Sequence, residues 1–286
     1  MYTKDSNMQK RGIRPWLIAQ QAKGKLYTTV DELKAAFPNS CSVNLKMAVR
    51  NAVKDKLMAY AWRGFYLILP PAYGVRGTLP PAFYIDALMK YLKRPYCVSL
   101  LNAAEVYGAA HQKPMSFTVM TSNPPPRDRK TAVSHLAFVG NRSFNSGIPA
   151  ELVRRIKVQT GYVTVASPEY TALSLVMHAK SSGGMSHVLT VLEELQDECH
   201  FEKLPNMMAR YIPTPCFQRL GYMLEFLLGN HDAGAHLHDY LRKNCQKTWR
   251  RVQLNPAVSA RSDAAALNKR WRVFENTILT SDSDDS

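Results

Sequence analysis

Length, composition and charge limit what this chain can be. It has 286 residues, of which 46% are hydrophobic and 21% charged, an ordinary globular balance that excludes a disordered or fibrous chain. Lys and Arg number 37 against 22 Asp and Glu, so the formal net charge is +15. A chain this basic favours a polyanionic partner, most simply nucleic acid and less often an acidic membrane surface.

The cysteines and the apolar segments indicate the compartment. The five cysteines include no C-x-x-C pair and their number is odd, so the sequence predicts free thiols rather than a disulfide framework or a four-cysteine zinc site. Reduced thiols are typical of the cytosol. No apolar run follows the first charged residues, and residues 222–228 are too short for a bilayer. We therefore expect a cytoplasmic protein with no signal peptide and no membrane span.

The excess positive charge is concentrated at the start of the chain. Residues 1–80 hold 13 basic and 4 acidic side chains, whereas residues 81–286 hold 24 and 18. Residues 70–81 contain two Pro-Pro pairs around two glycines, which cannot continue a helix or a central strand. We expect four parts: a basic domain over residues 1–72, a linker over 73–81, a larger domain over 82–276 and an acidic tail over 277–286.

In the basic domain the predicted order is helix, short strand, helix, helix and hairpin. Residues 13–22 have helical composition, and Thr29 with Glu32 fits a capping box for a second helix that runs to residue 37. Ser42 is expected to cap a third helix over residues 43–57. Residues 58–62 and 65–69 predict a hairpin that turns at Arg63 and Gly64. This is the order of a winged helix-turn-helix.

The third helix has the composition of a DNA-recognition helix. Its apolar positions fall on one stripe, and the other side carries polar, basic and methionine side chains. A helix fits the major groove of DNA, where outward donors meet phosphates and base edges. Lys46, Arg50 and Lys54 follow one edge, and asparagine amides can pair with adenine. We expect DNA contacts from Ser42, Asn44, Lys46, Arg50, Asn51, Lys54 and Arg63. A merely solvated basic face is the alternative interpretation.

Beyond the linker the sequence predicts a mixed body, so that the whole chain is expected to be an α+β fold. Ser99 is expected to cap a helix over residues 100–110, and Thr160 with Gly161 to close a hairpin. Ser167 and Pro168 have the types that begin a helix. A second basic region near the C-terminus could extend a DNA footprint, hold a partner or be solvated; it consists of Arg242, Lys243, Lys247, Arg250, Arg251, Arg261, Lys269, Arg270 and Arg272.

The sequence offers little for catalysis. It contains no Walker loop, no G-x-G-x-x-G, no H-E-x-x-H and no G-x-S-x-G. One segment has metal-like content but is interpreted as a polar loop between helices: His231, Asp232, His236, His238 and Asp239. Glu32 and Asp128 each precede a lysine, as in a nuclease, but both are interpreted as surface charge. We expect a protein that is not an enzyme and has no metal or cofactor; a DNA-tethered nuclease or nucleotide-modifying enzyme is the alternative.

Several segments, in this order along nearly the whole chain, resemble the AbiEi antitoxin family. They are GFYLILPP (64–71), YIDALM (84–89), RPYCVSLL (94–101), GAAHQ (108–112), TGYV (160–163), SPEYTAL (167–173), QRLGY (218–222) and NKRWRV (268–273).

The resemblance implies a bacterial repressor and antitoxin of a type IV toxin–antitoxin system for phage defence by abortive infection. The N-terminal winged helix of that family binds inverted repeats in its own operon promoter, which would place the chain on double-stranded nucleoid DNA. The C-terminal domain counteracts a nucleotidyltransferase-like toxin, without need of a stable complex, and can assist DNA binding. A pure transcriptional regulator without antitoxin activity is a further alternative.

Overall fold

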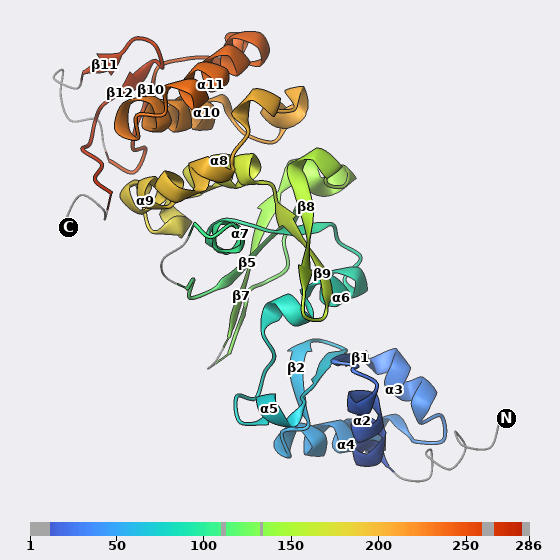
Figure 1. The fold of residues 1–286 in the computed structure, drawn as a ribbon. Coiled ribbons are helices and arrows are strands. Elements are labelled where there is room, and N and C mark those ends of the chain that lie inside the picture. The colour runs from blue at the N-terminus through green and yellow to red at the C-terminus, as the bar shows by residue number, and fades with distance from the viewer. Residues whose placement is uncertain (1–11, 110–112, 132–133, 259–265, 282–286) are drawn as a thin grey trace. The chain divides into compact units, whose positions relative to one another are not determined.

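The computed structural model describes residues 12–109, 113–131, 134–258 and 266–281 (Figure 1). The chain divides into two compact units, which are described separately. The first unit consists of Met1–Arg94, Arg127–Ala137 and Ile156–Val163. The second unit consists of Pro95–Pro126, Phe138–Arg155 and Thr164–Ser286. Helices, parallel pairs and antiparallel pairs occur together, so the predicted α+β class is confirmed.

The first unit begins with the element order expected of a winged helix-turn-helix. The elements are α2 (Ile13–Ala22), β1 (Tyr27–Thr29), α3 (Val30–Ala36), α4 (Ser42–Lys54), β2 (Met58–Trp62) and β3 (Phe65–Ile68). The three strands form an antiparallel sheet in the order β1-β3-β2, with Tyr27 opposite Leu67 and Met58 opposite Ile68. A shift in register between Tyr60 and Trp62 precedes the hairpin turn.

A capping box fixes the start of α3, as the sequence predicts. The Thr29 hydroxyl accepts from the Glu32 backbone N–H at 3.2 Å, and the Glu32 carboxylate accepts from the Thr29 N–H at 3.1 Å. The Lys25 ammonium donates to the same carboxylate at 2.9 Å. These contacts place Leu33 and Phe37 on the inner side of the helix and the turn that follows it.

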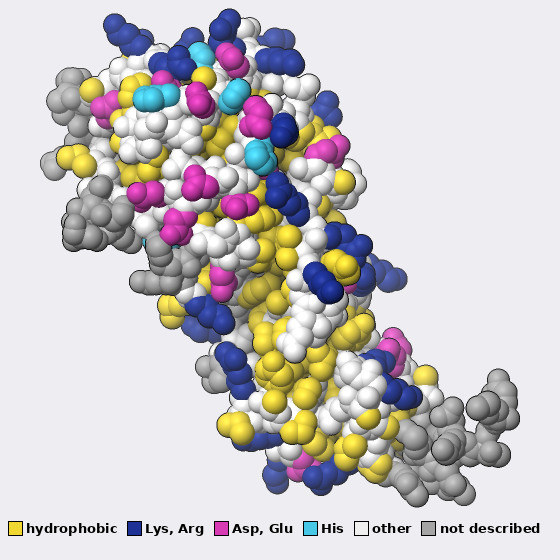
Figure 2. Space-filling view, viewed as in Figure 1, with side chains coloured by type: hydrophobic (Ala, Val, Ile, Leu, Met, Phe, Trp, Pro, Cys, Tyr) yellow, Lys and Arg dark blue, Asp and Glu magenta, His cyan; other side chains and the backbone are white. Residues whose placement is uncertain are grey.

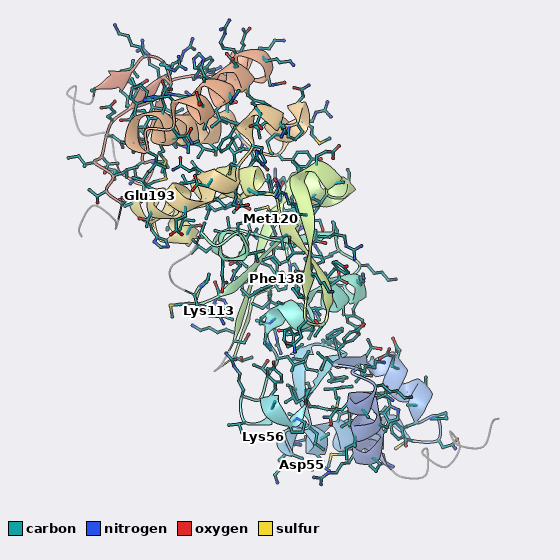
Figure 3. The ribbon with its side chains drawn as sticks, viewed as in Figure 1. Asp55, Lys56, Lys113, Met120, Phe138 and Glu193 are labelled. Atoms are coloured by element: carbon teal, nitrogen blue, oxygen red, sulfur yellow. The ribbon has the colours of Figure 1, made fainter. Side chains whose placement is uncertain are left out.

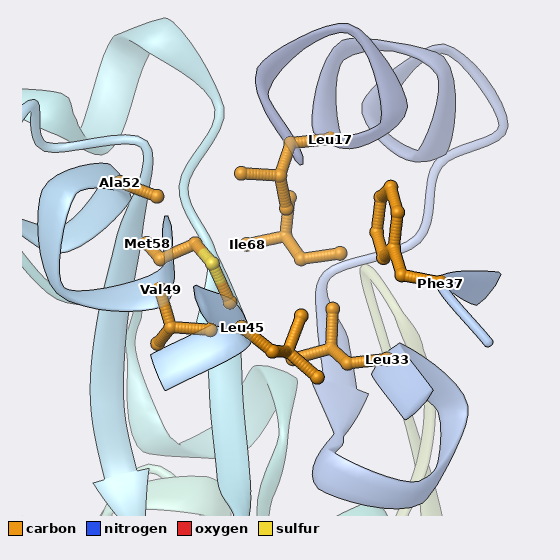
Figure 4. Packing of buried hydrophobic residues seen from close by; sticks show 8 residues of the cluster. All are labelled: Leu17, Leu33, Phe37, Leu45, Val49, Ala52, Met58 and Ile68. Carbon is orange, nitrogen blue, oxygen red and sulfur yellow. The ribbon is translucent and has the colours of Figure 1, made fainter. Parts of the chain in front are cut away.

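One hydrophobic core holds these helices and the sheet together (Figure 4). Eight buried side chains from α2, α3, the turn after α3, α4, β2 and β3 make up the cluster: Leu17, Leu33, Phe37, Leu45, Val49, Ala52, Met58 and Ile68. The Trp16 ring packs edge-on against Phe37 with centroids 5.9 Å apart. Since α4 gives the cluster residues at i, i+4 and i+7, its opposite side is left for solvent.

The segment after the hairpin is more structured than a bare linker. Short helix α5 (Pro71–Gly74) occupies its start, and α6 (Ile85–Tyr91) follows. The Tyr73 ring contacts Phe83 with centroids 6.0 Å apart. Leu79, Ile85, Leu88 and Met89 are fully buried.

Of the three sheets formed by the described residues, the largest has six strands in the order β6-β7-β5-β4-β9-β8. The strands are β4 (Tyr96–Val98), β5 (Phe117–Ser122), β6 (Arg129–Lys130), β7 (His135–Asn141), β8 (Val153–Val158) and β9 (Gly161–Ala166). Strand β4 pairs antiparallel with β5 and parallel with β9, so the sheet is mixed. The predicted hairpin of 156–165 corresponds to β8 and β9.

The second unit also contains most of the remaining helices of the described residues. They are α7 (Leu101–Val106), α8 (Pro168–Met177), α9 (Met185–Leu195), α10 (Thr214–Tyr222), a π-helical turn (Met223–Leu227) and α11 (His231–Asn244). Strands β10 (Val252–Gln253), β11 (Leu267–Asn268) and β12 (Val273–Phe274) form a small sheet in the order β10-β12-β11. Both units also contain short 3₁₀ turns, which are Pro81–Phe83, Arg142–Ser146, Ala150–Leu152, Ala179–Ser182, Gln196–Glu198, Phe201–Lys203, Asn206–Arg210 and Gln246–Thr248.

Two helix starts in this unit test the predicted caps. Ser167 caps α8 as expected, because its side chain accepts from the Tyr170 N–H at 3.2 Å. The cap at Ser99 is wrong: Leu100 has a left-handed φ of 55° and occupies the N-cap position, so α7 begins one residue later. The predicted end of that helix at residue 110 is wrong too, since α7 ends at Val106.

All five cysteines lie in the described part of the chain and all are free thiols, as predicted. Among the described residues, none of the helices combines the length and the hydropathy that a bilayer crossing requires.

Candidate nucleic-acid interface

Helix α4 presents the candidate interface, and its two ends differ from the sequence prediction. Cys41 has extended backbone angles and is the N-cap, with its Sγ 3.5 Å from the Asn44 N–H that donates to it. Ser42 is therefore the first helical residue and not the cap. At the other end Lys56 adopts a left-handed φ of 55°, which ends the helix at Lys54 rather than at residue 57 (Figure 3).

The structure places all seven predicted DNA-contacting residues on the surface of the first unit. Six lie on α4 and one in the turn of the β2–β3 hairpin: Ser42, Asn44, Lys46, Arg50, Asn51, Lys54 and Arg63, each of them exposed. Lys and Arg side chains and apolar side chains share the surface of this unit in Figure 2. Contact with DNA is not tested by these positions and stays a prediction.

Two further residues of this face were not included in the predicted site. The Val43 side chain is 64% exposed and the Met47 side chain 51% exposed. With Arg50 and Lys54 they follow the spacing i, i+4, i+7 and i+11, directly opposite the buried stripe of Leu45 and its neighbours. The same helical spacing that identified the core stripe therefore could have identified them.

The cations of this face are electrostatically uncompensated. Lys46, Arg50 and Lys54 take part in none of the ion pairs formed among the described residues. No Asp or Glu occurs in the helix itself. Exposed charges without a partner keep their positive potential available to a polyanion.

The nearby carboxylate of Glu32 is bound internally. Burial acts to raise its pKa, but hydrogen bonds from the Lys25 ammonium and the Thr29 backbone N–H outweigh burial, and the pKa is lowered. Glu32 is thus an ionised helix cap, not a free carboxylate beside the cationic face.

The hairpin turn at Arg63 is held from two sides. The Tyr91 hydroxyl donates to the Arg63 carbonyl oxygen at 3.2 Å, and the Val30 N–H donates to the Gly64 carbonyl at 2.8 Å. Gly64 has a φ of 78°, and a Cβ there would collide with the Tyr91 hydroxyl. The turn therefore requires glycine and presents the Arg63 side chain to solvent.

The histidine-rich segment near residue 235 is a helix and not the polar loop that the sequence suggested. His231 to Asp239 lie in α11, and no group of three metal-ligating side chains occurs within the described ranges. The His238 ring packs edge-on against Trp249 and Trp271, with centroids 5.2 and 5.5 Å away. Burial and then the Arg270 charge lower its pKa, which favours the uncharged form of the ring.

Two further features of the sequence remain, Asp128 and the basic region near the C-terminus. The Asp128 carboxylate is exposed, and its contact with His135 is 3.8 Å long. In the C-terminal basic region Arg270 donates to the Glu225 carboxylate at 2.9 Å, and Arg272 donates to the Trp249 carbonyl at 2.6 Å. Arg261 of that region lies outside the described residues.

Comparisons with known proteins bear on the second unit most directly. Residues 96–226 match the family model described as the AbiEi antitoxin C-terminal domain. This segment belongs to the AbiEi antitoxin C-terminal domain family. The resemblance to AbiEi antitoxins found in the sequence is confirmed over these residues.

The fold has a solved counterpart. The chain is similar to the crystal structure of the RV2827C protein from Mycobacterium tuberculosis, with a TM-score of 0.62 and 15% identity over 90% of this chain and 89% of that chain. At this identity the similarity concerns the fold alone. No curated protein matches the chain.

Proposed function

We propose that this AbiEi-type chain is a type IV antitoxin and a DNA-binding transcriptional autorepressor. Residues 1–72 bind inverted repeats in the promoter of its own operon, and residues 82–276 counteract a nucleotidyltransferase-like toxin. The observation that carries the DNA-binding part is the exposed and unpaired cationic face of α4. The antitoxin part is supported by the match of residues 96–226 to the AbiEi antitoxin C-terminal domain.

Phosphate contacts follow from the cations of α4 and the hairpin turn. Lys46, Arg50 and Lys54 recur every four residues, so they wind slowly along one edge of the helix. A recognition helix inserted in the major groove brings such an edge to one DNA strand, while Arg63 reaches the backbone beside it. Each phosphate neutralised releases a condensed counterion, which makes binding steeply dependent on salt.

Base contacts follow from the amide side chains of the same helix. Asn44 and Asn51 are exposed amides, which can donate to and accept from the adenine edge in the major groove. Ser42 begins the helix, where free backbone N–H groups and a hydroxyl favour a phosphate oxygen. The N-terminal residues of recognition helices are those that approach base edges.

Fluorescence anisotropy with the full chain tests the repressor part. The DNA upstream of its own gene is compared with a scrambled duplex of equal composition over a series of KCl concentrations. We expect tight binding with a clear preference for the native duplex. Equal and steeply salt-dependent binding to both duplexes would show that DNA binding is non-specific and would contradict the proposal that the chain is an autorepressor.

Coexpression in bacteria tests the antitoxin part separately. The full chain is expressed with the nucleotidyltransferase-like toxin gene that the proposal places in the same operon, and growth is compared with expression of that gene alone. We expect the wild-type chain to restore growth and the double variant Arg50→Ala/Lys54→Ala to restore it equally while losing promoter repression. Failure of the wild-type chain to restore growth would leave a transcriptional regulator without antitoxin activity.

A further inference from the structure

The centre of the outward face of α4 is apolar. Val43 and Met47 expose more than half of their side-chain surface there, although Leu45, Val49 and Ala52 on the inner face already supply the core. Neither outward side chain contributes to the cluster that holds the unit together. Since residues i and i+4 are neighbours on a helix surface, the two side chains form one small apolar area on the outward face.

The surroundings of this pair are polar and cationic. Successive residues on a helix turn by about 100°, which places the amides of Asn44 and Asn51 on one flank of the pair. Lys46 and Arg50 lie on the other flank. No carboxylate occurs between residues 42 and 54. This face therefore suits a partner that has negative charge around apolar groups and hydrogen-bonding edges next to them.

We infer that Val43 and Met47 contact the C5-methyl groups of thymines, so that α4 selects T·A pairs in its operator. This inference rests on the proposed DNA binding and adds the base class that is read. In the major groove of DNA the thymine methyl is the apolar group on display, and phosphates line both edges. The flanking amides suit adenine, the partner of thymine, so both kinds of contact select the same base pairs.

The spacing of the two side chains limits where the thymines lie. The Cβ atoms of residues i and i+4 on a helix are about 5–6 Å apart. Successive base pairs rise by about 3.4 Å. The two methyl contacts therefore fall on thymines one or two base-pair steps apart within each half-site.

Replacement of thymine by deoxyuridine tests the inference on the full chain. Duplexes bound by the wild-type protein are first selected from a random library, without reference to any promoter. Each thymine of the selected sequence is then replaced singly by deoxyuridine, which removes the methyl and keeps base pairing. Affinities are measured by anisotropy for the wild type, Val43→Ala, Met47→Ala and the matched control Ile18→Ala, an equally exposed apolar residue on α2.

We expect two thymines, one or two steps apart, at which the loss of the methyl weakens wild-type binding about fourfold, as burial of one carbon group implies. The loss should persist in Ile18→Ala and disappear at one of the two positions in each of the α4 variants. Both α4 positions are solvent-exposed, so circular dichroism melting should match the wild type.

Three outcomes would overturn the inference. The first is selective DNA binding that no deoxyuridine weakens, and the second is a methyl effect that both α4 variants retain in full. In either case the chain can still be a repressor, but Val43 and Met47 do not contact thymine methyl groups. The third is reduced self-association of the α4 variants in ultracentrifugation with unchanged DNA affinity, which would assign the pair to a contact between copies. A fourth outcome, a library that yields no preferred sequence, would overturn the proposed repressor function and the inference together.

Discussion

The Tyr91 hydroxyl donates a hydrogen bond to the carbonyl oxygen of Arg63, 3.2 Å away, and so joins helix α6 to the hairpin turn. The bond restrains the backbone that carries the Arg63 guanidinium. Tyr91→Phe removes this bond and keeps the ring, which also contacts Phe65 with centroids 5.6 Å apart. A bond at the surface contributes about 1 kcal/mol or less, so we expect DNA affinity to fall by about fivefold at most.

Anisotropy with the selected duplex measures this effect, and Tyr73→Phe is the matched control. Tyr73 belongs to the same unit, and its ring contact with Phe83 does not need the hydroxyl. The control should bind as the wild type does. If Tyr91→Phe binds equally well and Arg63→Ala binds worse, the turn positions Arg63 without help from α6.

The cations of α4 make a quantitative prediction about salt. Each phosphate contact contributes about 0.9 to the slope of log affinity against log salt concentration. Arg50→Ala/Lys54→Ala should therefore flatten the slope by about 2 and weaken binding to native and scrambled duplexes alike. The control Lys113→Ala/Lys180→Ala removes two exposed cations of the second unit and should leave the slope unchanged. An unaltered slope in the α4 variant would remove both residues from the phosphate contacts.

The capping box predicts a pH-dependent contribution to stability. Because folding lowers the pKa of Glu32, its ionised form stabilises the protein above the pKa of the unfolded chain, and this stabilisation is lost as pH falls through the folded pKa. Glu32→Gln should cost about 1 kcal/mol or less near neutral pH, since the group is partly exposed and screened by solvent. The difference from wild type should vanish in acid.

Urea unfolding of both proteins at neutral and acidic pH measures this difference. Glu151→Gln is the control, because Glu151 is exposed and forms no ion pair among the described residues. A Glu32→Gln deficit that persists unchanged at low pH would mean that the charge of Glu32 does not stabilise α3.

Local chemistry explains which elements of the first unit were predictable. Thr29 and Glu32 are three residues apart, so their capping box depends on neighbours in sequence alone. The start of α4 is decided differently: residue type predicted Ser42 as the cap, whereas Cys41 is the N-cap and the backbone turns helical at Ser42. The difference depends on how α3, the turn and the core position the chain, which residue type alone does not show.

Contacts between distant residues explain most of what the sequence could not predict in the second unit. The Trp271 indole N–H donates at 2.8 Å to Glu225, which is 46 residues away. The same contact region includes His238, whose ring packs on Trp271 and so belongs to a helix face rather than to a loop. No spacing rule relates these positions, because their proximity depends on how α10, α11 and the small sheet pack.

The fully buried Trp271 yields a prediction about Gly221 on α10. A Cβ added to Gly221 would overlap the Trp271 ring. Two hydrogen bonds hold Trp271 in place: its carbonyl oxygen accepts from the Gln218 side chain at 2.8 Å, and its indole N–H donates to Glu225. Because neither the ring nor the helix backbone is free to move, we expect Gly221→Ala to destabilise the protein by about 1–3 kcal/mol, despite the better helix propensity of alanine.

Gly74→Ala is the matched control, since a Cβ there meets only the Lys56 backbone oxygen, at an ordinary distance of 3.7 Å. Thermal melting followed by tryptophan fluorescence should show a lower midpoint for Gly221→Ala and no decrease for Gly74→Ala. An unchanged midpoint for Gly221→Ala would mean that the Trp271 ring can move aside and that its contact with α10 is not tightly packed.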